Sequence, residues 1–285
     1  MNKILVTGSN GQLGSEIRNH FKNFEAKFYY TDQNELDILD FKLVESFIIK
    51  NKINIILNCA AYTAVDLAET NKDLAFKVNT GAVLNFVNIC SAHNCKLIQI
   101  STDFVFTENY SSPINEEEKT TPSSVYGLSK DQAEKAILKS NINCVIIRTS
   151  WLYSKYGNNF VKTIKEIANK KKSINVVNDQ FGSPTYAKDL AESCLEFIKT
   201  ESSTIVGINL YHFTNNGTCS WYDFAQEIVF LSNLSCKVFP VSSSEYITAA
   251  TRPLYSKLDT TKIEKKFNLK IPNWKESLKK CIKEL

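Results

Sequence analysis

The sequence of 285 residues has no long hydrophobic run, few histidines and no paired-cysteine motif. No apolar stretch approaches the roughly 20 residues that span a bilayer, and the short apolar N-terminus argues against a signal peptide. The three histidines lie far apart and none of the eight cysteines forms Cys-x-x-Cys, which argues against a zinc site. Cysteines in apolar segments are typical of reduced, buried thiols. We therefore expect a cytoplasmic protein with no metal and no membrane partner.

The sequence also lacks a large excess of charge of either sign. The net charge is +4, from 34 basic and 30 acidic side chains, and lysine clusters at 170–172, 265–266 and 279–280 are typical of solvated helix faces. A nucleic-acid-binding protein usually has a stronger imbalance and a recognisable motif, so we expect no nucleic-acid partner. The length suits one large domain or two unequal ones.

A glycine-rich turn follows the first predicted strand. Apolar residues 3–7 precede Gly8-Ser9-Asn10-Gly11-Gln12-Leu13-Gly14, and residues 15–24 then have the periodicity of an amphipathic helix. Glycines permit a tight turn and let the main chain approach a pyrophosphate, whose negative charge the helix N-terminus favours. Between a strand and a helix at the start of the chain, the pattern favours dinucleotide binding.

Strands and helices alternate through the first half of the chain, which predicts an α/β fold with a parallel, doubly wound (Rossmann) sheet. Asp32 ends the second strand, about 20 residues past the glycines, where an acid would hold the adenosine ribose hydroxyls. We place Asp37 near the adenine. Residues 107–122 are polar and predict a surface loop. Further strands are expected over 26–31, 53–59, 96–101 and 143–149, and helices over 41–50, 69–93 and 126–139.

The character of the sequence changes after Ser150, where aromatic and amide side chains become frequent. We expect residues 1–150 to form a dinucleotide-binding domain. Residues 151–285 would form mainly a smaller, mixed α/β substrate lobe, with elements at about 186–213 returning to the first domain. The expected elements are a loop over 178–185, a strand over 210–213, and helices over 186–199, 219–232 and 275–285.

Tyr126 and Lys130 lie on one face of a predicted helix, about 6 Å apart along its axis. An ammonium beneath a phenol favours the ionised phenol, which can then exchange a proton with a carbonyl oxygen near neutral pH. Such a pair occurs by chance in many helices, so its context decides. Ser101-Thr102-Asp103 supplies that context, because it ends a strand where a hydroxyl would point into the ligand crevice.

Together these motifs resemble the extended short-chain dehydrogenase/reductase superfamily and, within it, the dTDP-4-dehydrorhamnose reductases. The superfamily traits are Thr7-Gly8-x-x-Gly11-x-x-Gly14, Asn58-x-Ala60-Ala61, Ser101-Thr102-Asp103 and Tyr126-x-x-x-Lys130. The narrower resemblance covers nearly the whole chain. It depends on Ala64-Val65-Asp66-x-Ala68-Glu69, Arg148-Thr149-Ser150-Trp151, Gly157-Asn158-Asn159-Phe160, Asp179-Gln180-x-Gly182 and Arg252-Pro253.

The resemblance implies that NADH or NADPH reduces the C4 keto group of a nucleotide-activated 4-keto-6-deoxy sugar, for cell-surface polysaccharide synthesis. The implied catalytic residues are Thr102, Tyr126 and Lys130. The cofactor-binding residues would be Gly8, Gly11, Gln12, Leu13, Gly14, Asp32, Asp37, Ile38, Ala61, Tyr62 and Thr63, with Tyr126 and Lys130. We expect substrate contacts from Thr102, Asp103, Trp151 and Asn159. Arg252 is our candidate for the substrate's diphosphate, because guanidinium binds phosphate oxygens bidentately.

Two other functions stay open from the sequence: a nucleotide-sugar epimerase with tightly bound NAD, and a non-catalytic nucleotide-binding regulatory subunit. A regulatory subunit would be free to lose Tyr126 or Lys130, and both are present. Dehydratases of the superfamily generally have Asp-Glu beside the catalytic hydroxyl, where this chain has Asp103-Phe104. The reductases often have tyrosine at 104 and Asp-Gly at Thr107-Glu108, which leaves the exact sugar open.

Asp32 also predicts that NADH serves at least as well as NADPH. Its carboxylate is placed where the 2′-phosphate would go, and no arginine follows it before Arg148. Two such charges roughly 4 Å apart repel by about 4 kcal/mol at an effective dielectric constant of about 20. The sequence does not determine the oligomeric state, and a homodimer is compatible with it.

Overall fold

The computed structural model describes residues 1–20, 24–107, 110–199 and 206–285. Its centre is a six-stranded sheet in the order β10-β5-β4-β3-β1-β2, in which every pairing is parallel. The predicted parallel, doubly wound sheet is therefore confirmed. The strands are β1 (Asn2–Thr7), β2 (Ala26–Tyr30), β3 (Ile55–Asn58), β4 (Lys96–Thr102), β5 (Asn143–Thr149) and β10 (Ile208–His212).

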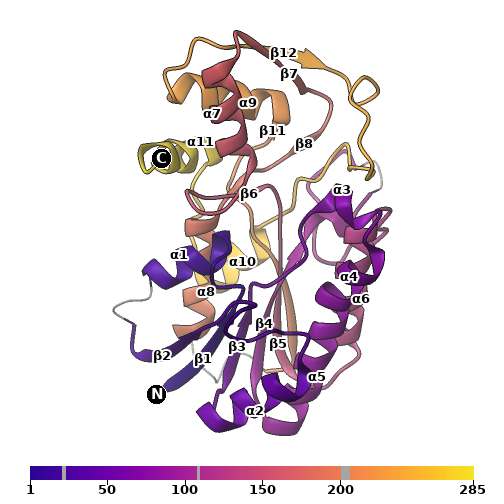
Figure 1. The fold of residues 1–285 in the computed structure, drawn as a ribbon, viewed down its shortest axis with the longest axis vertical. Coiled ribbons are helices and arrows are strands. Elements are labelled where there is room, and N and C mark those ends of the chain that lie inside the picture. Colours follow the sequence, from indigo (N-terminus) through magenta and orange to yellow (C-terminus); the bar gives the residue numbers. More distant parts are fainter. Residues whose placement is uncertain (21–23, 108–109, 200–205) are drawn as a thin grey trace.

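Helices cover both faces of this sheet (Figure 1). One face, with Ile4 and Val6, packs against α1 (Gln12–His20), α8 (Ala187–Lys199) and α10 (Thr261–Phe267). The other face, with Leu5 and Ile56, packs against α2 (Phe41–Asn51), α5 (Ala82–His93) and α6 (Val125–Leu138). Burial on both faces explains why these strands are continuous apolar runs. Helix α1 begins earlier than predicted, and residues 21–23 near its predicted end lie outside the described residues.

The strand order reverses at β1, which lies between β2 and β3. In an open α/β sheet, ligands bind outside the carboxyl ends of the strands at such a point. Gly8 follows β1 in the left-handed region, with φ of 60°. A Cβ atom there would lie 2.7 Å from Cα of Ala60, which follows β3. Only glycine fits this approach, so the turn is built as the sequence predicts.

The single helix predicted over 69–93 is wrong. The structure has α3 (Val65–Ala68), α4 (Lys72–Phe76), a π-helical turn (Lys77–Gly81) and then α5. The hydroxyl of Thr70 donates to the carbonyl oxygen of Leu67, which helps to end α3. In the π-helical turn, Asn79 and Thr80 both bond to Ser129 of α6. The extra residue of the turn brings both side chains to that helix.

A smaller lobe lies above the carboxyl ends of the sheet in Figure 1. Its core joins α7 (Phe160–Lys170), α9 (Trp221–Leu231) and α11 (Trp274–Lys283) to the parallel pair β7 (Ser173–Val177) and β12 (Lys237–Val241). The loop predicted over 178–185 instead contains two short strands, because its main chain pairs with neighbouring segments. These are β8 (Phe181–Gly182) with β11 (Cys219–Ser220), and β9 (Thr185–Tyr186) with β6 (Leu152–Tyr153).

Helix α8 and strand β10 belong to the sheet side of the molecule. The division into two domains near residue 150 stays a prediction.

In the described part of the chain, no helix has the length and apolarity to cross a membrane, and no three His, Cys, Asp or Glu side chains are grouped to hold a metal ion. All eight cysteines are free.

The surface loop predicted over 107–122 is partly wrong. Ile114 is 1% exposed and forms a β-bridge with Leu258. The carboxylate of Glu116 accepts a hydrogen bond from the main-chain N–H of His212 in β10. The segment therefore covers the open edge of the sheet and satisfies a donor there. Residues 108–109, which include Glu108, lie outside the described residues.

Candidate active site

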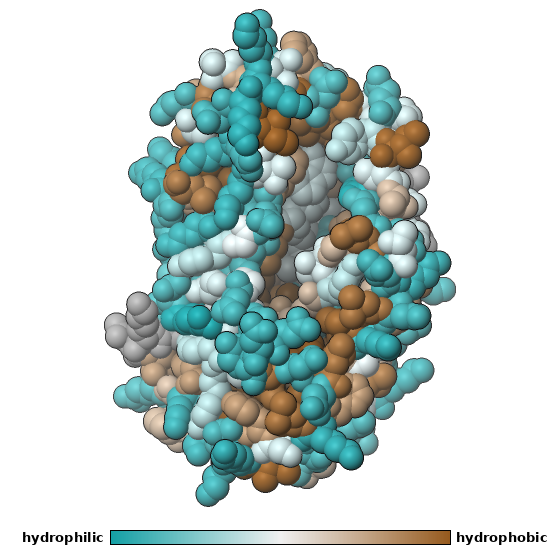
Figure 2. All heavy atoms as spheres, in the orientation of Figure 1, coloured by the Kyte–Doolittle hydropathy of each residue, from teal (hydrophilic) through white to brown (hydrophobic). Residues whose placement is uncertain are grey.

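A cavity of about 620 Å³ opens between the sheet and the smaller lobe, and we name it the central cavity. Figure 2 shows the molecule hollowed at this level. The carboxyl ends of β3, β4 and β5 and the N-terminal turns of α1 and α6 contribute its walls. The predicted site residues that line it are Gly11, Gln12, Leu13, Ala61, Thr63, Thr102, Asp103, Tyr126, Lys130, Trp151, Asn159 and Arg252.

A second cavity of about 530 Å³ adjoins the first and shares Gly11, Cys59, Ala60 and Ala61 with it. We name it the adjoining cavity. The predicted residues Gly8, Asp32, Asp37, Ile38 and Tyr62 line it. Gly14 lines neither cavity, because it packs against the main chain of Gly8 and Ser9. The structure therefore brings every site residue predicted from the sequence, except Gly14, to the walls of these two adjoining cavities.

The two cavities fit an extended dinucleotide. Gly8 lies so close to the main chain of Ala60 that the ends of β1 and β3 meet without an intervening side chain at position 8. The N-terminus of α1, at Gln12, offers free N–H groups and a positive dipole end to a pyrophosphate. Asp32 accepts hydrogen bonds from the main-chain N–H groups of Asn10, at 2.9 Å, and Gln33, at 2.8 Å. These bonds fix the carboxylate at the rim of the adjoining cavity.

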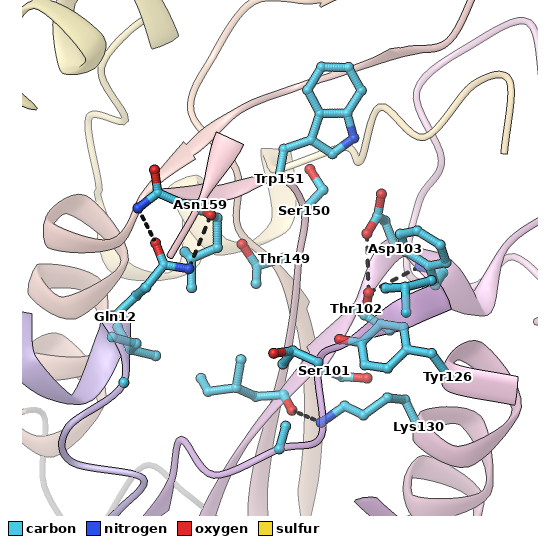
Figure 3. Close-up of a pocket in the computed structure, with 18 of the residues that line it drawn as sticks. Gln12, Ser101, Thr102, Asp103, Tyr126, Lys130, Thr149, Ser150, Trp151 and Asn159 are labelled. Carbon is cyan, nitrogen blue, oxygen red and sulfur yellow. Dashed lines mark hydrogen bonds between the residues drawn. The ribbon is translucent and has the colours of Figure 1, made fainter. Parts of the chain in front are cut away.

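Thr102, Tyr126 and Lys130 meet at one wall of the central cavity (Figure 3). Thr102 ends β4, and Tyr126 and Lys130 project from the first turns of α6. Ser124 begins this helix by accepting the N–H of Gly127 at 3.1 Å. The hydroxyl of Thr102 lies close enough to the phenol of Tyr126 to lower its pKa. A proton donor and a second hydroxyl therefore face the same space.

The expected electrostatic effect of Lys130 on Tyr126 is wrong. Burial raises the pKa of Tyr126 to about 12, and the charge of Asp103 adds to the rise against the bond from Thr102. Burial also lowers the pKa of Lys130 to about 8, although the charge of Glu134 opposes this. Because desolvation outweighs the nearby charges at both groups, the phenol keeps its proton at neutral pH.

Asp103 is 2% exposed and lies beside Thr102. Its Oδ1 accepts a hydrogen bond from the Thr102 hydroxyl at 3.1 Å. Burial raises the pKa of this carboxyl to about 7, although the nearby hydroxyls of Ser256 and Thr102 act to lower it. The carboxyl therefore changes charge close to neutral pH, one hydrogen bond away from the Thr102 hydroxyl.

Aromatic rings of the smaller lobe form the opposite wall. Trp151 has a positive φ of 46° and stacks on Trp221, with ring centroids 3.6 Å apart. A Cβ atom at Gly182 would lie 2.8 Å from the Trp151 ring, so glycine is needed there. Asn159 begins α7 and also donates to the side-chain oxygen of Gln12 at 3.0 Å. This bond joins the smaller lobe to the glycine-rich turn.

Arg252 spans the mouth of the central cavity to Asp66 of α3. Its two terminal nitrogens bond the two carboxylate oxygens at 3.1 Å and 2.6 Å. The guanidinium lowers the pKa of Asp66. Arg252 is not a free surface arginine, because it joins the loop before α10 to the sheet side of the cavity.

A family model described as RmlD substrate binding domain matches residues 1–285. A curated dTDP-4-dehydrorhamnose reductase of Aggregatibacter actinomycetemcomitans is 36% identical over 288 residues, covering 98% of this chain and 98% of that protein. The chain belongs to the dTDP-4-dehydrorhamnose reductase family. The resemblance read from the motifs is thereby confirmed.

Solved structures of the dTDP-4-dehydrorhamnose reductase family superpose on nearly the whole chain. One, from Clostridium acetobutylicum, is 38% identical with a TM-score of 0.93 and covers 99% of each chain. Another, from Bacillus anthracis in complex with NADP, is 36% identical with a TM-score of 0.94 and covers 100% of each chain. These matches confirm the fold over both parts of the molecule.

This member of the dTDP-4-dehydrorhamnose reductase family has a buried ion pair behind the wall of Thr102 and Lys130, which sequence reasoning missed. Arg148 of β5 forms three hydrogen bonds with Glu134 of α6, and the hydroxyl of Ser101 also donates to Glu134. Arg148 and Glu134 are 3% and 1% exposed. Glu134 follows Lys130 by one helical turn. The pair thus joins β4, β5 and α6 directly beneath Thr102 and Lys130.

Asn79 is a second residue that sequence reasoning missed. Its side chain accepts from the N–H of Tyr62 at 2.8 Å and donates to the carbonyl oxygen of Tyr62 at 3.1 Å. It also donates to Ser129 of α6 at 2.9 Å. Asn79 therefore holds the segment of Ala61, Tyr62 and Thr63 that lines both cavities. The available signal was a polar residue inside an apolar helical pattern, without a partner nearby in sequence.

Proposed function

We propose that this chain reduces the C4 keto group of dTDP-4-dehydro-L-rhamnose to give dTDP-L-rhamnose, with NADH or NADPH as the reductant. The observation that carries the proposal is the convergence of Thr102, Tyr126 and Lys130 on one wall of the central cavity. That cavity adjoins a second one whose glycine turn and Asp32 fit a dinucleotide. Membership of the reductase family supports the same reaction.

A nicotinamide cofactor held by the two cavities would supply the hydride for C4 of the sugar. Tyr126 gives its phenolic proton to the oxygen that becomes the hydroxyl, acting as general acid. With a pKa raised to about 12, the phenol holds this proton until charge develops on the oxygen. Thr102 donates a hydrogen bond to the same oxygen and stabilises that charge. The sugar therefore gains one hydride at C4 and one proton at the oxygen bound to C4.

Lys130 lies one turn beyond Tyr126, where it would hold the nicotinamide ribose. The ammonium donates to the carbonyl oxygen of Ile100. To bind the ribose it must either break this hydrogen bond or use another of its N–H donors. Trp151, Asp103 and Asn159 are proposed to contact the sugar. Arg252 is proposed to bind the diphosphate through those donors of its guanidinium that Asp66 does not use.

The proposed pathway role is cell-surface polysaccharide synthesis from a nucleotide-sugar substrate in the cytoplasm. The Bacillus anthracis relative was solved with NADP, which supports NADPH as one cofactor. A preference for NADH stays a prediction from Asp32. A homodimer also stays a prediction.

The experiment that tests the function is NADH oxidation with a panel of nucleotide-linked 4-keto sugars. The parent should oxidise NADH fastest with dTDP-4-dehydrorhamnose. Tyr126→Phe keeps the ring but removes the proton, so its rate should fall by about 10²–10⁴-fold while NADH affinity changes little. Tyr222→Phe, on the outer helix α9, is the matched control and should turn over like the parent.

Two outcomes would contradict this function. Oxidation of no 4-keto nucleotide sugar would favour the non-catalytic subunit. NAD that remains bound through purification, with interconversion of epimers and no net NADH oxidation, would favour the epimerase. If Tyr126→Phe reacts within a few-fold of the parent, the reductase assignment can stand but the proton donor is wrong.

A further inference from the structure

A cationic side chain is bonded to Asn10, which lines the adenosine end of the predicted dinucleotide site. Arg18 is on α1, and its Nη2 donates to the hydroxyl of Ser9 at 2.6 Å and to the side-chain oxygen of Asn10 at 3.3 Å. Asn10 in turn lines the adjoining cavity and donates its main-chain N–H to Asp32 at 2.9 Å. The guanidinium therefore reaches the Asp32 carboxylate through one intervening residue.

The position of this guanidinium is fixed by its surroundings. Its central carbon lies over the ring of Tyr30, 5.2 Å from the centroid, and Tyr30 is the last residue of β2. Ser9, the other partner, is 1% exposed. A cation held by a ring and two side chains loses little further entropy when it binds an anion. Arg18 is thus prepared for a ligand and is not simply a freely moving surface arginine.

The charge of Arg18 is not neutralised by a protein carboxylate. Within the described ranges, no Asp or Glu oxygen lies within 4.0 Å of its nitrogens. Only Nη2 takes part in the hydrogen bonds above, which leaves other donors of the guanidinium for a ligand. An arginine with spare donors beside the ribose-binding acid has the chemistry to bind a phosphate group.

We propose that Arg18 is the specificity residue that admits the 2′-phosphate of NADPH, so that this chain uses both nicotinamide cofactors. Asp32 would hold the free 2′-hydroxyl of NADH. When the 2′-phosphate is present, the guanidinium attracts it and offsets its repulsion by Asp32. The inference rests on the proposed dinucleotide site and corrects the reasoning that led from Asp32 to NADH, which considered only arginines later in the chain.

The test is equilibrium binding of two adenosine fragments, with no sugar and no turnover. Adenosine 2′,5′-bisphosphate carries the 2′-phosphate, and adenosine 5′-monophosphate does not. Arg18→Met should weaken binding of the bisphosphate by about 10–100-fold, the usual range for a lost hydrogen bond to a charged group. Binding of the monophosphate should change less than about 2-fold, which also shows that the variant is folded.

Three further variants separate specificity from structure. Arg18→Lys keeps the charge and should recover part of the bisphosphate affinity. Asp32→Asn should strengthen bisphosphate binding, since it removes the repulsion. Lys27→Met removes an equal charge from β2, the strand that carries Tyr30, and should leave the ratio of the two affinities unchanged.

The outcomes are distinct. Equal weakening of both fragments in Arg18→Met would show that Arg18 only supports the turn, and would overturn the proposal. An unchanged ratio with normal binding would also overturn it and leave the dinucleotide site intact. Failure of the parent to bind either fragment would overturn both this inference and the proposed cofactor site.

Discussion

The ammonium of Lys130 donates a hydrogen bond to the main-chain carbonyl oxygen of Ile100, across 2.6 Å. Ile100 is in β4, two residues before Thr102, so the lysine is bound to the strand that delivers the catalytic hydroxyl. The phenol of Tyr126 lies in the same wall, where burial raises its pKa to about 12. In this arrangement the tyrosine is a protonated acid, which is the form that a reductase needs before hydride transfer.

The first prediction concerns the pH dependence of turnover. Burial lowers the pKa of Lys130 to about 8, so its positive charge is present below that pH and is lost as the pH rises. The rate should therefore fall above about pH 8. Glu134 raises the pKa of Lys130 by its charge, so Glu134→Gln should shift this fall to lower pH. The measurement is the pH profile of kcat/KM for both proteins.

The control is Glu134→Asp, which keeps the charge on a shorter side chain and should keep the fall near its parental pH. General damage to the fold would lower the rate at every pH without moving the profile. A Glu134→Gln profile superimposable on the parent's would show that Glu134 has no electrostatic influence on the site.

The second prediction concerns the stability provided by the buried Glu134–Arg148 pair. Arg148→Met leaves the carboxylate buried without its partner, so the free energy of unfolding should fall by about 3–5 kcal/mol. The double change Glu134→Leu with Arg148→Met removes both charges and should be less destabilised than Arg148→Met alone. Urea unfolding of the four proteins of this cycle measures the coupling. Additive losses would mean that the two charges do not interact.

The third prediction concerns Asp103. Burial raises its pKa from 3.8 to about 7, so between these values the native state holds a proton that the unfolded chain releases. The stability that this proton confers is fully present below about pH 3.8 and is lost as the pH rises through about 7. The asparagine of Asp103→Asn does not titrate, so this variant does not lose that stability as the pH rises. Its stability relative to the parent should rise over that window, by at most roughly 4 kcal/mol.

Urea unfolding of Asp103→Asn and the parent at several pH values across this window gives the difference directly. Asp32→Asn is the matched control, since Asp32 is at the cavity rim. A constant difference between Asp103→Asn and the parent would show that Asp103 titrates alike in the folded and unfolded states.

The fold could be predicted because its physical causes are local. Strands buried on both faces must be apolar throughout, and the turn between Gly8 and Gly14 must be glycine-rich to pass beneath Ala60. The positions of Thr102 and Tyr126 also follow from element ends, which a parallel sheet gathers at one edge. Helix breaks were harder, because the one near Asn79 depends on contacts with α6 that lie far away in sequence.

The electrostatics of the site could not be read from the sequence. The spacing of Tyr126 and Lys130 was correct, but their pKa values depend on burial, which outweighs the neighbouring charges. Arg148 and Glu134 meet only because α6 packs on the sheet beside β4 and β5. Arg18 was missed because the search for an arginine covered only the residues after Asp32, whereas Arg18 precedes it. Its side chain reaches back from α1 to Ser9, in the turn before that helix.

The last prediction concerns the stacked pair of Trp151 and Trp221. Trp221 lies against Trp151 with an angle of 11° between the rings, and both line the central cavity. Trp221→Ala removes the ring that holds Trp151 in place. Because such stacking is worth about 0.5–1.5 kcal/mol, KM for the sugar nucleotide should rise about 2- to 10-fold. The cofactor affinity should not change, since Trp221 does not line the adjoining cavity.

Two controls make this prediction specific. Trp221→Phe keeps an aromatic face and should recover most of the parental KM. Trp274→Phe alters the remaining tryptophan, which is 4% exposed in the core of the smaller lobe and lines neither cavity. It should lower stability and leave KM near the parental value. If Trp221→Ala and Trp274→Phe raise KM equally, the effect comes from loosening of the lobe, and the stacked pair does not position the substrate.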